Sequence, residues 1–116
     1  MHRTAIMILS ALALGTPNAF AHAFLDHAEP RVGSSVSSAP REVSLSFTQN
    51  LEAAFSTVEV RDAGGARVDQ GKSQVSASTL RVGLKSLPPG TYKVRWRVLS
   101  VDTHRTEGTF SFRVGQ

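Results

Sequence analysis

The sequence predicts an all-β fold, an Ig-like Greek-key β-sandwich or barrel of about seven strands. Three observations lead to this prediction. Apolar and polar residues alternate with a period of two in several segments, which is typical of half-buried strands. Turn signals such as Asp-Ala-Gly-Gly at 62–65 and Leu-Pro-Pro-Gly at 87–90 separate the segments at short intervals. The chain after its first 21 residues shows no helical periodicity, and short strands with frequent turns favour a sandwich.

The expected strands can be taken in chain order from this alternation. The segments are 24–27, 43–48, 57–61, a short one at 74–77, 79–84, 92–98 and 109–114. Side chains two apart in a strand share a face, so the apolar set of each segment is expected to point inward. The predicted core is Leu25, Val43, Leu45, Phe47, Val58, Val60, Leu80, Val82, Tyr92, Val94, Trp96, Val98, Phe110, Phe112 and Val114.

The start of the chain has the pattern of an export signal. Arg3 gives a basic beginning, an apolar run covers 5–14, and Ala-Phe-Ala at 19–21 offers small residues for cleavage. The apolar run is shorter than the roughly 20 residues that a membrane-spanning helix needs. We therefore expect a signal peptide at 1–21 and one exported domain at 22–116.

A second cleavage position remains open. Ala21, His22 and Ala23 also form a small-x-small pattern. A cut after Ala21 makes His22 the first residue of the mature chain, whereas a cut after Ala23 removes it.

Composition excludes several function classes. The 116 residues carry a formal net charge of +4, and the basic residues are scattered along the chain. Without a contiguous basic run, nucleic-acid binding is not expected. The chain has no cysteine, and both methionines, Met1 and Met7, lie in the leader, so the mature domain has no sulfur ligand. Nothing in the sequence indicates an obligate interface, and we expect a monomer.

The strongest candidate chemistry is a metal site formed by His22, Asp102 and His104. A mature N-terminal His22 offers two nitrogens, the α-amine and the imidazole, which can close a chelate ring. Asp102 and His104 add a carboxylate and a second imidazole. Three nitrogens and one oxygen suit Cu(II) better than most other ions. Proton competition for the amine and the imidazoles would weaken binding in acid.

Each of these residues also has a simpler interpretation. His22 would then be a polar residue at a frayed terminus, and Asp102 would cap a turn beside a solvated His104. If the chain is extended there, Asp102 and His104 face the core, where an unpaired carboxylate is costly. A loop at 102–108 or a partner charge would resolve this conflict. His27 is expected to be a surface or packing residue. Phe24 excludes the amino-terminal copper motif, which needs histidine at mature position three.

Other chemistries find less support in the sequence. It contains no Gly-x-Ser-x-Gly elbow and no phosphate-binding glycine loop. Asp62 and Asp69 flank a turn and are expected to be solvated. Because no convincing acid–base pair is present, we do not expect an enzyme.

Five segments resemble the CopC family of periplasmic copper-binding proteins. They are 22–30, 45–51, 90–98, 100–104 and 108–114, which together extend over essentially the whole mature chain. The most specific part is Tyr-Lys-Val-Arg-Trp-Arg-Val at 92–98 followed by Asp-Thr-His at 102–104, with histidine first after the leader.

The resemblance implies a Greek-key sandwich or barrel that binds one Cu(II) at its edge through His22, Asp102 and His104. It further implies a role in copper resistance or copper supply across the inner membrane, beside a CopD-type membrane partner. Two features depart from the family pattern. The mature chain lacks the methionine-rich Cu(I) segment of some members, which indicates the Cu(II)-only type. Gln49 replaces an acidic residue, so any support from that carboxylate would be weaker here.

The preferred hypothesis is therefore a periplasmic Cu(II) chaperone or buffer. One alternative is a copper-dependent oxidative enzyme, because an N-terminal histidine and a second histidine also form the site of polysaccharide monooxygenases. The small domain and the carboxylate in the ligand set argue against it. Another alternative is a metal-free scaffold domain on the same sandwich, which would not bind copper tightly.

Overall fold

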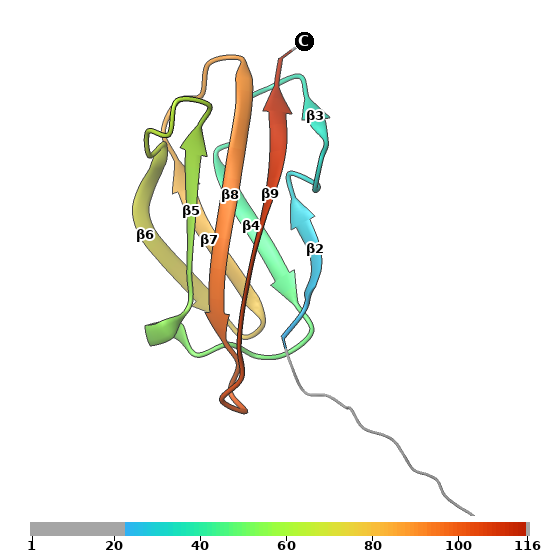
Figure 1. The fold of residues 1–116 in the computed structure, drawn as a ribbon, viewed down its shortest axis with the longest axis vertical. Helices are drawn as coiled ribbons and strands as arrows, with labels where there is room; N and C mark the ends of the chain where they lie inside the picture. Colours follow the sequence, from blue (N-terminus) through green and yellow to red (C-terminus); the bar gives the residue numbers. More distant parts are fainter. Residues whose placement is uncertain (1–22, 116) are drawn as a thin grey trace, which may run out of the picture.

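A computed structural model describes residues 23–115, and in it two four-stranded sheets pack face to face (Figure 1). The first sheet has the order β2-β4-β7-β6, with β2 (Leu25–Glu29), β4 (Glu42–Phe47), β7 (Thr79–Leu84) and β6 (Asp69–Ser76). The second has the order β3-β9-β8-β5, with β3 (Ser35–Val36), β9 (Arg105–Val114), β8 (Gly90–Leu99) and β5 (Thr57–Asp62). The predicted all-β sandwich is confirmed.

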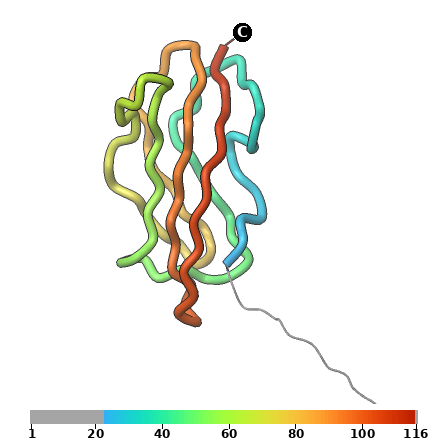
Figure 2. The backbone as a smooth tube through the Cα atoms, in the orientation of Figure 1, coloured from blue at the N-terminus to red at the C-terminus, as the bar shows by residue number. Residues whose placement is uncertain are grey.

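The longest ladder in the second sheet is the β8–β9 hairpin. Its antiparallel register runs without interruption from Gly90 opposite Val114 to Leu99 opposite Arg105. The turn of this hairpin extends beyond the sheets at the end of the sandwich where β2 begins (Figure 2). The 3-10 turn η2 (Ala53–Phe55), between β4 and β5, lies at the same end (Figure 1). Segments far apart in the sequence therefore meet at one end of the fold.

The core lies between the sheets and matches the predicted set closely. Every predicted core residue is buried except Leu25, which is only half-buried because it begins the edge strand β2, and β2 has a neighbouring strand on one side only. Phe47 and Trp96 pack edge to face across the sheets, with ring centroids 5.0 Å apart. Such a pair adds about 0.5–1.5 kcal/mol beyond its buried area. The buried hydrophobic core also contains five residues outside the predicted set: Ala23, Ala28, Leu51, Leu84 and Leu87.

Two strands begin several residues earlier than predicted, and one short strand was not predicted. β6 begins at Asp69 rather than at 74. A bulge between Asp69 and Ser73 interrupts the alternation of apolar and polar residues there, so the pattern did not indicate the start of the strand. β9 begins at Arg105 rather than at 109. None of the residues 105–109 is buried, so this part of the strand shows no apolar alternation. The short strand β3 lies in a serine-rich connection and pairs in parallel with the end of β9.

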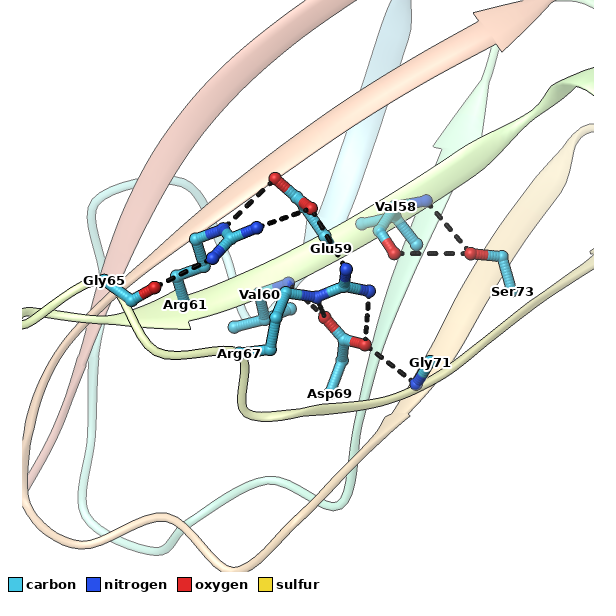
Figure 3. A network of polar contacts seen from close by, with 9 residues as sticks. All are labelled: Val58, Glu59, Val60, Arg61, Gly65, Arg67, Asp69, Gly71 and Ser73. Atoms are coloured by element: carbon cyan, nitrogen blue, oxygen red, sulfur yellow. Dashed lines mark hydrogen bonds and ion pairs between the residues drawn. The ribbon is translucent and has the colours of Figure 1, made fainter.

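Asp69 joins the edges of the two sheets, and the prediction that it is solvated is wrong (Figure 3). Its side chain is fully buried. One carboxylate oxygen accepts the Val60 amide at 2.7 Å and Arg67 Nε at 2.9 Å. The other accepts the Gly71 amide and an Arg67 NH2 group, both at 2.8 Å. Four donors thus compensate the burial of the charge.

These donors also determine the protonation of Asp69. Burial alone raises the pKa of this carboxyl, but Arg67 and the amides of Val60 and Gly71 outweigh burial and leave the pKa below its ordinary value. A second side chain also joins β6 to β5: Ser73 Oγ accepts the Val58 amide at 3.0 Å (Figure 3). The edges of β5 and β6 are therefore linked through side chains.

In contrast to Asp69, Asp62 is half-buried and accepts the turn amides of Gly64 and Ala66, at 3.0 and 2.9 Å.

Candidate metal centre

The turn between β8 and β9 carries two of the three predicted ligands. The Ser100 amide donates to the His104 carbonyl and the Thr103 amide to the Ser100 carbonyl, both at 2.9 Å. Thr103 has a φ of 71°, in the left-handed region that costs an L-residue about 1–2 kcal/mol. The chain is therefore not extended at Asp102 and His104, and both residues are exposed instead of facing the core. A tight turn resolves the predicted conflict, and it is shorter than the expected loop at 102–108.

Asp102 and His104 lie side by side on this turn. Asp102 Oδ1 is 3.3 Å from His104 Nδ1, and the two side chains keep 34% and 47% of their surface exposed. Ligand atoms about 2.0–2.1 Å from one divalent ion are about 2.9–3.4 Å apart when the bond angle is between about 90° and 110°. The observed separation fits a pair of neighbouring ligands on one ion.

Ser100 is the residue at this site that the sequence analysis missed. It is fully buried, and its hydroxyl donates to Asp102 Oδ1. Ser100 Oγ also accepts the His104 amide at 3.3 Å. The hydrogen bond from Ser100, and after it the contact with His104, outweigh the opposing effect of burial and lower the pKa of Asp102. A serine two residues before an aspartate at a strand end was the available signal, because hydroxyls often bind side chains and amides of the turn that follows.

The first described residues are anchored beside the same hairpin. Ala23 is buried, and its carbonyl accepts the Thr106 hydroxyl at 2.8 Å. Phe24 and Thr48 are joined by two hydrogen bonds of 2.9 Å, one through the Phe24 amide and one to its carbonyl. The chain thus enters the sandwich beside Thr106, which follows His104 by two positions in the sequence. His22 itself, the third predicted ligand, lies outside the described residues.

The segment after β4 supports the turn from its other side. The Val101 amide donates to the Asn50 carbonyl at 3.0 Å, and the Glu52 amide donates to the Leu99 carbonyl at 2.8 Å. Gln49, the departure from the family pattern, is half-buried next to Asn50. The turn is therefore supported by backbone hydrogen bonds on both sides of Ser100.

The remaining histidine of the described chain is not part of this cluster. His27 is a surface residue, as expected, with 62% of its side chain exposed and its Nδ1 3.8 Å from Asp26 Oδ2. Within residues 23–115, no group of three or more His, Cys, Asp or Glu side chains is placed to bind a metal ion. Among the described residues, the candidate metal centre therefore consists of the Asp102–His104 pair. The described residues also contain no helix long and apolar enough to cross a membrane.

The fold and this turn define a class of small β-sandwich with an exposed Asp–His pair at one end. The family model described as the CopC domain matches residues 25–115, and the chain belongs to the CopC family. It is 35% identical to Protein YobA of Escherichia coli strain K12, over 97% of this chain and 93% of that protein. It is also 33% identical to Copper resistance protein C of Xanthomonas campestris pv. juglandis, over 93% and 91% of the two chains.

A third relative is much longer than this chain. The chain is 30% identical to the Copper transport protein CutJ of Bacillus subtilis over 96% of its own length, but it covers only 21% of that protein. Among solved structures, CopC from Methylosinus trichosporium OB3b superposes with a TM-score of 0.71 at 33% identity, covering 80% of this chain and 93% of that one. PcoC, a methionine-rich copper resistance protein from E. coli, also gives 0.71, at 29% identity over 81% and 99%.

Proposed function

We propose that this protein is an exported, periplasmic Cu(II)-binding chaperone or buffer, and that it is not an enzyme. The proposed ligands are the amine and imidazole of His22, the Asp102 carboxylate and the His104 imidazole. The observation that carries this proposal is the Asp102–His104 pair, which lies on an exposed turn with its ligand atoms 3.3 Å apart. Family membership adds to it, since relatives are named for copper resistance and copper transport.

The anchoring of Ala23 explains how a ligand from the other end of the sequence can contribute. Consecutive Cα atoms are about 3.8 Å apart, so residue 22 is tied to the position of Ala23. The Ala23 carbonyl accepts a hydrogen bond from the hydroxyl of Thr106, which follows His104 by two positions. If the leader is cleaved after Ala21, the new amine and imidazole both start within one residue of this anchor.

The donor set favours Cu(II) as the cargo. Amine, imidazole and carboxylate groups are the ligands that Cu(II) accepts readily, whereas Cu(I) prefers thioether and thiolate sulfur. The chain has no cysteine, and both of its methionines lie within the proposed signal peptide, 1–21. We therefore propose that the mature protein binds copper in the oxidised state and does not exchange it between oxidation states.

The long relative suggests a partner for copper transfer. In CutJ of B. subtilis, a region similar to this chain is part of a protein about five times larger that is named for copper transport. We propose that the present chain acts as a separate monomer and exchanges Cu(II) with a CopD-type transporter of the inner membrane, in copper resistance or copper supply.

The test is a Cu(II) titration of protein processed from its own leader, with the N-terminus verified by intact mass. A matched sample carries one extra residue before His22, which removes the free α-amine from the chelate. We expect tight one-to-one binding in the processed protein and a large loss in the extended sample. Equal or negligible binding in both samples would exclude His22. Given ascorbate, the copper-loaded protein is expected to make no peroxide at a steady rate, and turnover would favour an oxidative enzyme.

A further inference from the structure

We propose that Ser100 is a positioning residue that holds the Asp102 carboxylate and the backbone of the turn in the arrangement needed for the metal. This inference rests on the proposed function, because it assigns a role in the same site. Ser100 is not proposed as a ligand: its side chain is buried beneath the turn, whereas Asp102 and His104 are exposed.

The hydroxyl of Ser100 acts on both candidate ligands at once. It donates its proton to Asp102 Oδ1, and its oxygen accepts the His104 amide at 3.3 Å. The backbone of the same residue is also engaged, because the Ser100 amide donates to the His104 carbonyl at 2.9 Å. One residue therefore fixes the side chain of Asp102 and the backbone of His104.

The burial of Ser100 gives this arrangement its rigidity. Ser100 has no solvent-exposed surface and forms an isolated bridge with Leu51, a core residue. A buried hydroxyl has few rotamers available, and water does not compete for its hydrogen bonds. Asp102, by contrast, is exposed and would otherwise sample several rotamers. The energetic cost of orienting the carboxylate is then met by folding rather than by metal binding.

The neighbouring hydroxyl is not equivalent. Thr103 Oγ1 is exposed and donates to the backbone carbonyl of Asp102, so it makes no contact with the carboxylate. Among residues 23–115, Ser100 is the side chain whose contacts join the core to Asp102 and to the His104 backbone. An outer residue of this kind typically changes metal affinity by about 10- to 100-fold when it is removed.

Ser56 provides a matched control for removing a buried hydroxyl. It is also buried at this end of the sandwich, and its Oγ accepts the Leu99 amide at 3.1 Å without contacting Asp102 or His104. In the processed protein, Ser100→Ala is expected to weaken Cu(II) binding about 10- to 100-fold. Ser56→Ala is expected to lower stability by a similar amount and to leave the affinity unchanged. The probe is Cu(II) alone, measured in competition with a chromogenic chelator.

A spectroscopic readout separates positioning from a general loss of stability. The electron paramagnetic resonance spectrum of bound Cu(II) is expected to change in Ser100→Ala and to match the wild type in Ser56→Ala. An affinity loss below about threefold relative to Ser56→Ala, or an unchanged spectrum, overturns the proposal. If Ser100→Ala does not fold, Ser100→Thr and Ser100→Val give the same test, because they have similar shapes and only threonine keeps the hydroxyl. The threonine variant should then bind more tightly, and equal affinities would overturn the proposal.

The same titration distinguishes this proposal from the proposed function. Asp102→Ala and His104→Ala are measured in parallel with the serine variants. If both bind Cu(II) as tightly as the wild type, the proposed site itself is wrong. If both lose binding while Ser100→Ala does not, the site stands and only the role of Ser100 is wrong.

Discussion

Two aspartates, Asp69 where β6 meets β5 and Asp102 on the β8–β9 turn, have different environments. Asp69 is the first residue of β6, its side chain is fully buried, and each of its two carboxylate oxygens accepts two hydrogen bonds (Figure 3). Asp102 lies on the β8–β9 turn, keeps a third of its side chain exposed, and contacts Ser100 and His104. Both carboxyls have pKa values below the ordinary value.

The comparison shows that a lowered pKa alone does not identify a functional carboxylate. Asp69 is saturated, because a guanidinium and two backbone amides use its acceptor capacity. Such a group can stabilise the fold but has no oxygen left for a metal ion. Asp102 contacts the Ser100 hydroxyl and His104 instead of a guanidinium, and it retains access to solvent. The remaining acceptor capacity and the exposure, rather than the pKa, make Asp102 the candidate ligand.

The largest effect expected from this comparison is on stability. Asp69→Ala removes the acceptor for the amides of Val60 and Gly71 and for Arg67. Buried donors without acceptors cost about 1–3 kcal/mol each, so we expect the free energy of unfolding to fall by about 2–5 kcal/mol. Urea unfolding measures this value. A loss below about 1 kcal/mol would mean that the contact between β5 and β6 does not depend on Asp69. As a control, folded Asp69→Ala should still bind Cu(II) as the wild type does.

The next effect is on copper affinity. His104→Ala removes a proposed ligand at an exposed position, so we expect Cu(II) affinity to fall by at least about 100-fold, more than is typical for the loss of an outer partner. Stability without metal should change by less than about 1 kcal/mol, because the side chain is exposed. Competition titration and urea unfolding of the same samples check both values. Wild-type affinity would show that the ligand set is wrong.

Acid provides a smaller and graded test. The folded pKa of Asp69 lies below its value in the unfolded chain, so its ionised form stabilises the fold above about pH 4, and this contribution is lost as the pH falls below that. The difference in unfolding free energy between wild type and Asp69→Asn should therefore shrink between pH 5 and acid conditions below about pH 4. Asp102→Asn should show a smaller change, since solvent screens this exposed carboxylate. An equal change in both variants would contradict the distinction between them.

The smallest effect is expected at His27. This exposed histidine lies 3.8 Å from Asp26 and is not among the contacts of Asp69 or Asp102. His27→Ala should change the free energy of unfolding by no more than about 0.5 kcal/mol and leave Cu(II) affinity unchanged. A marked loss of affinity in the titration would mean that His27 is a ligand and that the site extends along β2.

Most of the fold could be predicted because the central strands alternate clearly. In β8, for example, Tyr92, Val94, Trp96 and Val98 are buried and the residues between them are exposed, as expected. The edges were harder to predict. A bulge hides the start of β6, and serine-rich β3 pairs over two residues with β9. Edge strands carry less of the apolar pattern, since only part of each is covered by the core.

The candidate site was predictable in its residue types but not in its geometry. The residue types of Asp102 and His104 indicated a metal site. The expectation that both side chains face the core assumed an extended chain, and the chain is not extended at Thr103. A positive φ at a threonine has no sequence signature. The burial of Asp69 was equally hidden, because an aspartate beside a turn is usually solvated and its donors come from a neighbouring strand. Ser100 could have been recognised only by relating a buried strand end to the acid two positions later.

The hydrogen bond between Ala23 and Thr106 joins residues 83 positions apart. If copper binds His22 together with Asp102 and His104, the ion acts as a reversible cross-link between the two ends of the folded chain. A ligand that binds only the folded state adds about 2.7 kcal/mol to stability when its free concentration is 100 times the Kd. The loaded protein would then resist unfolding and proteolysis more than the empty one, so that copper supply also sets the lifetime of its carrier.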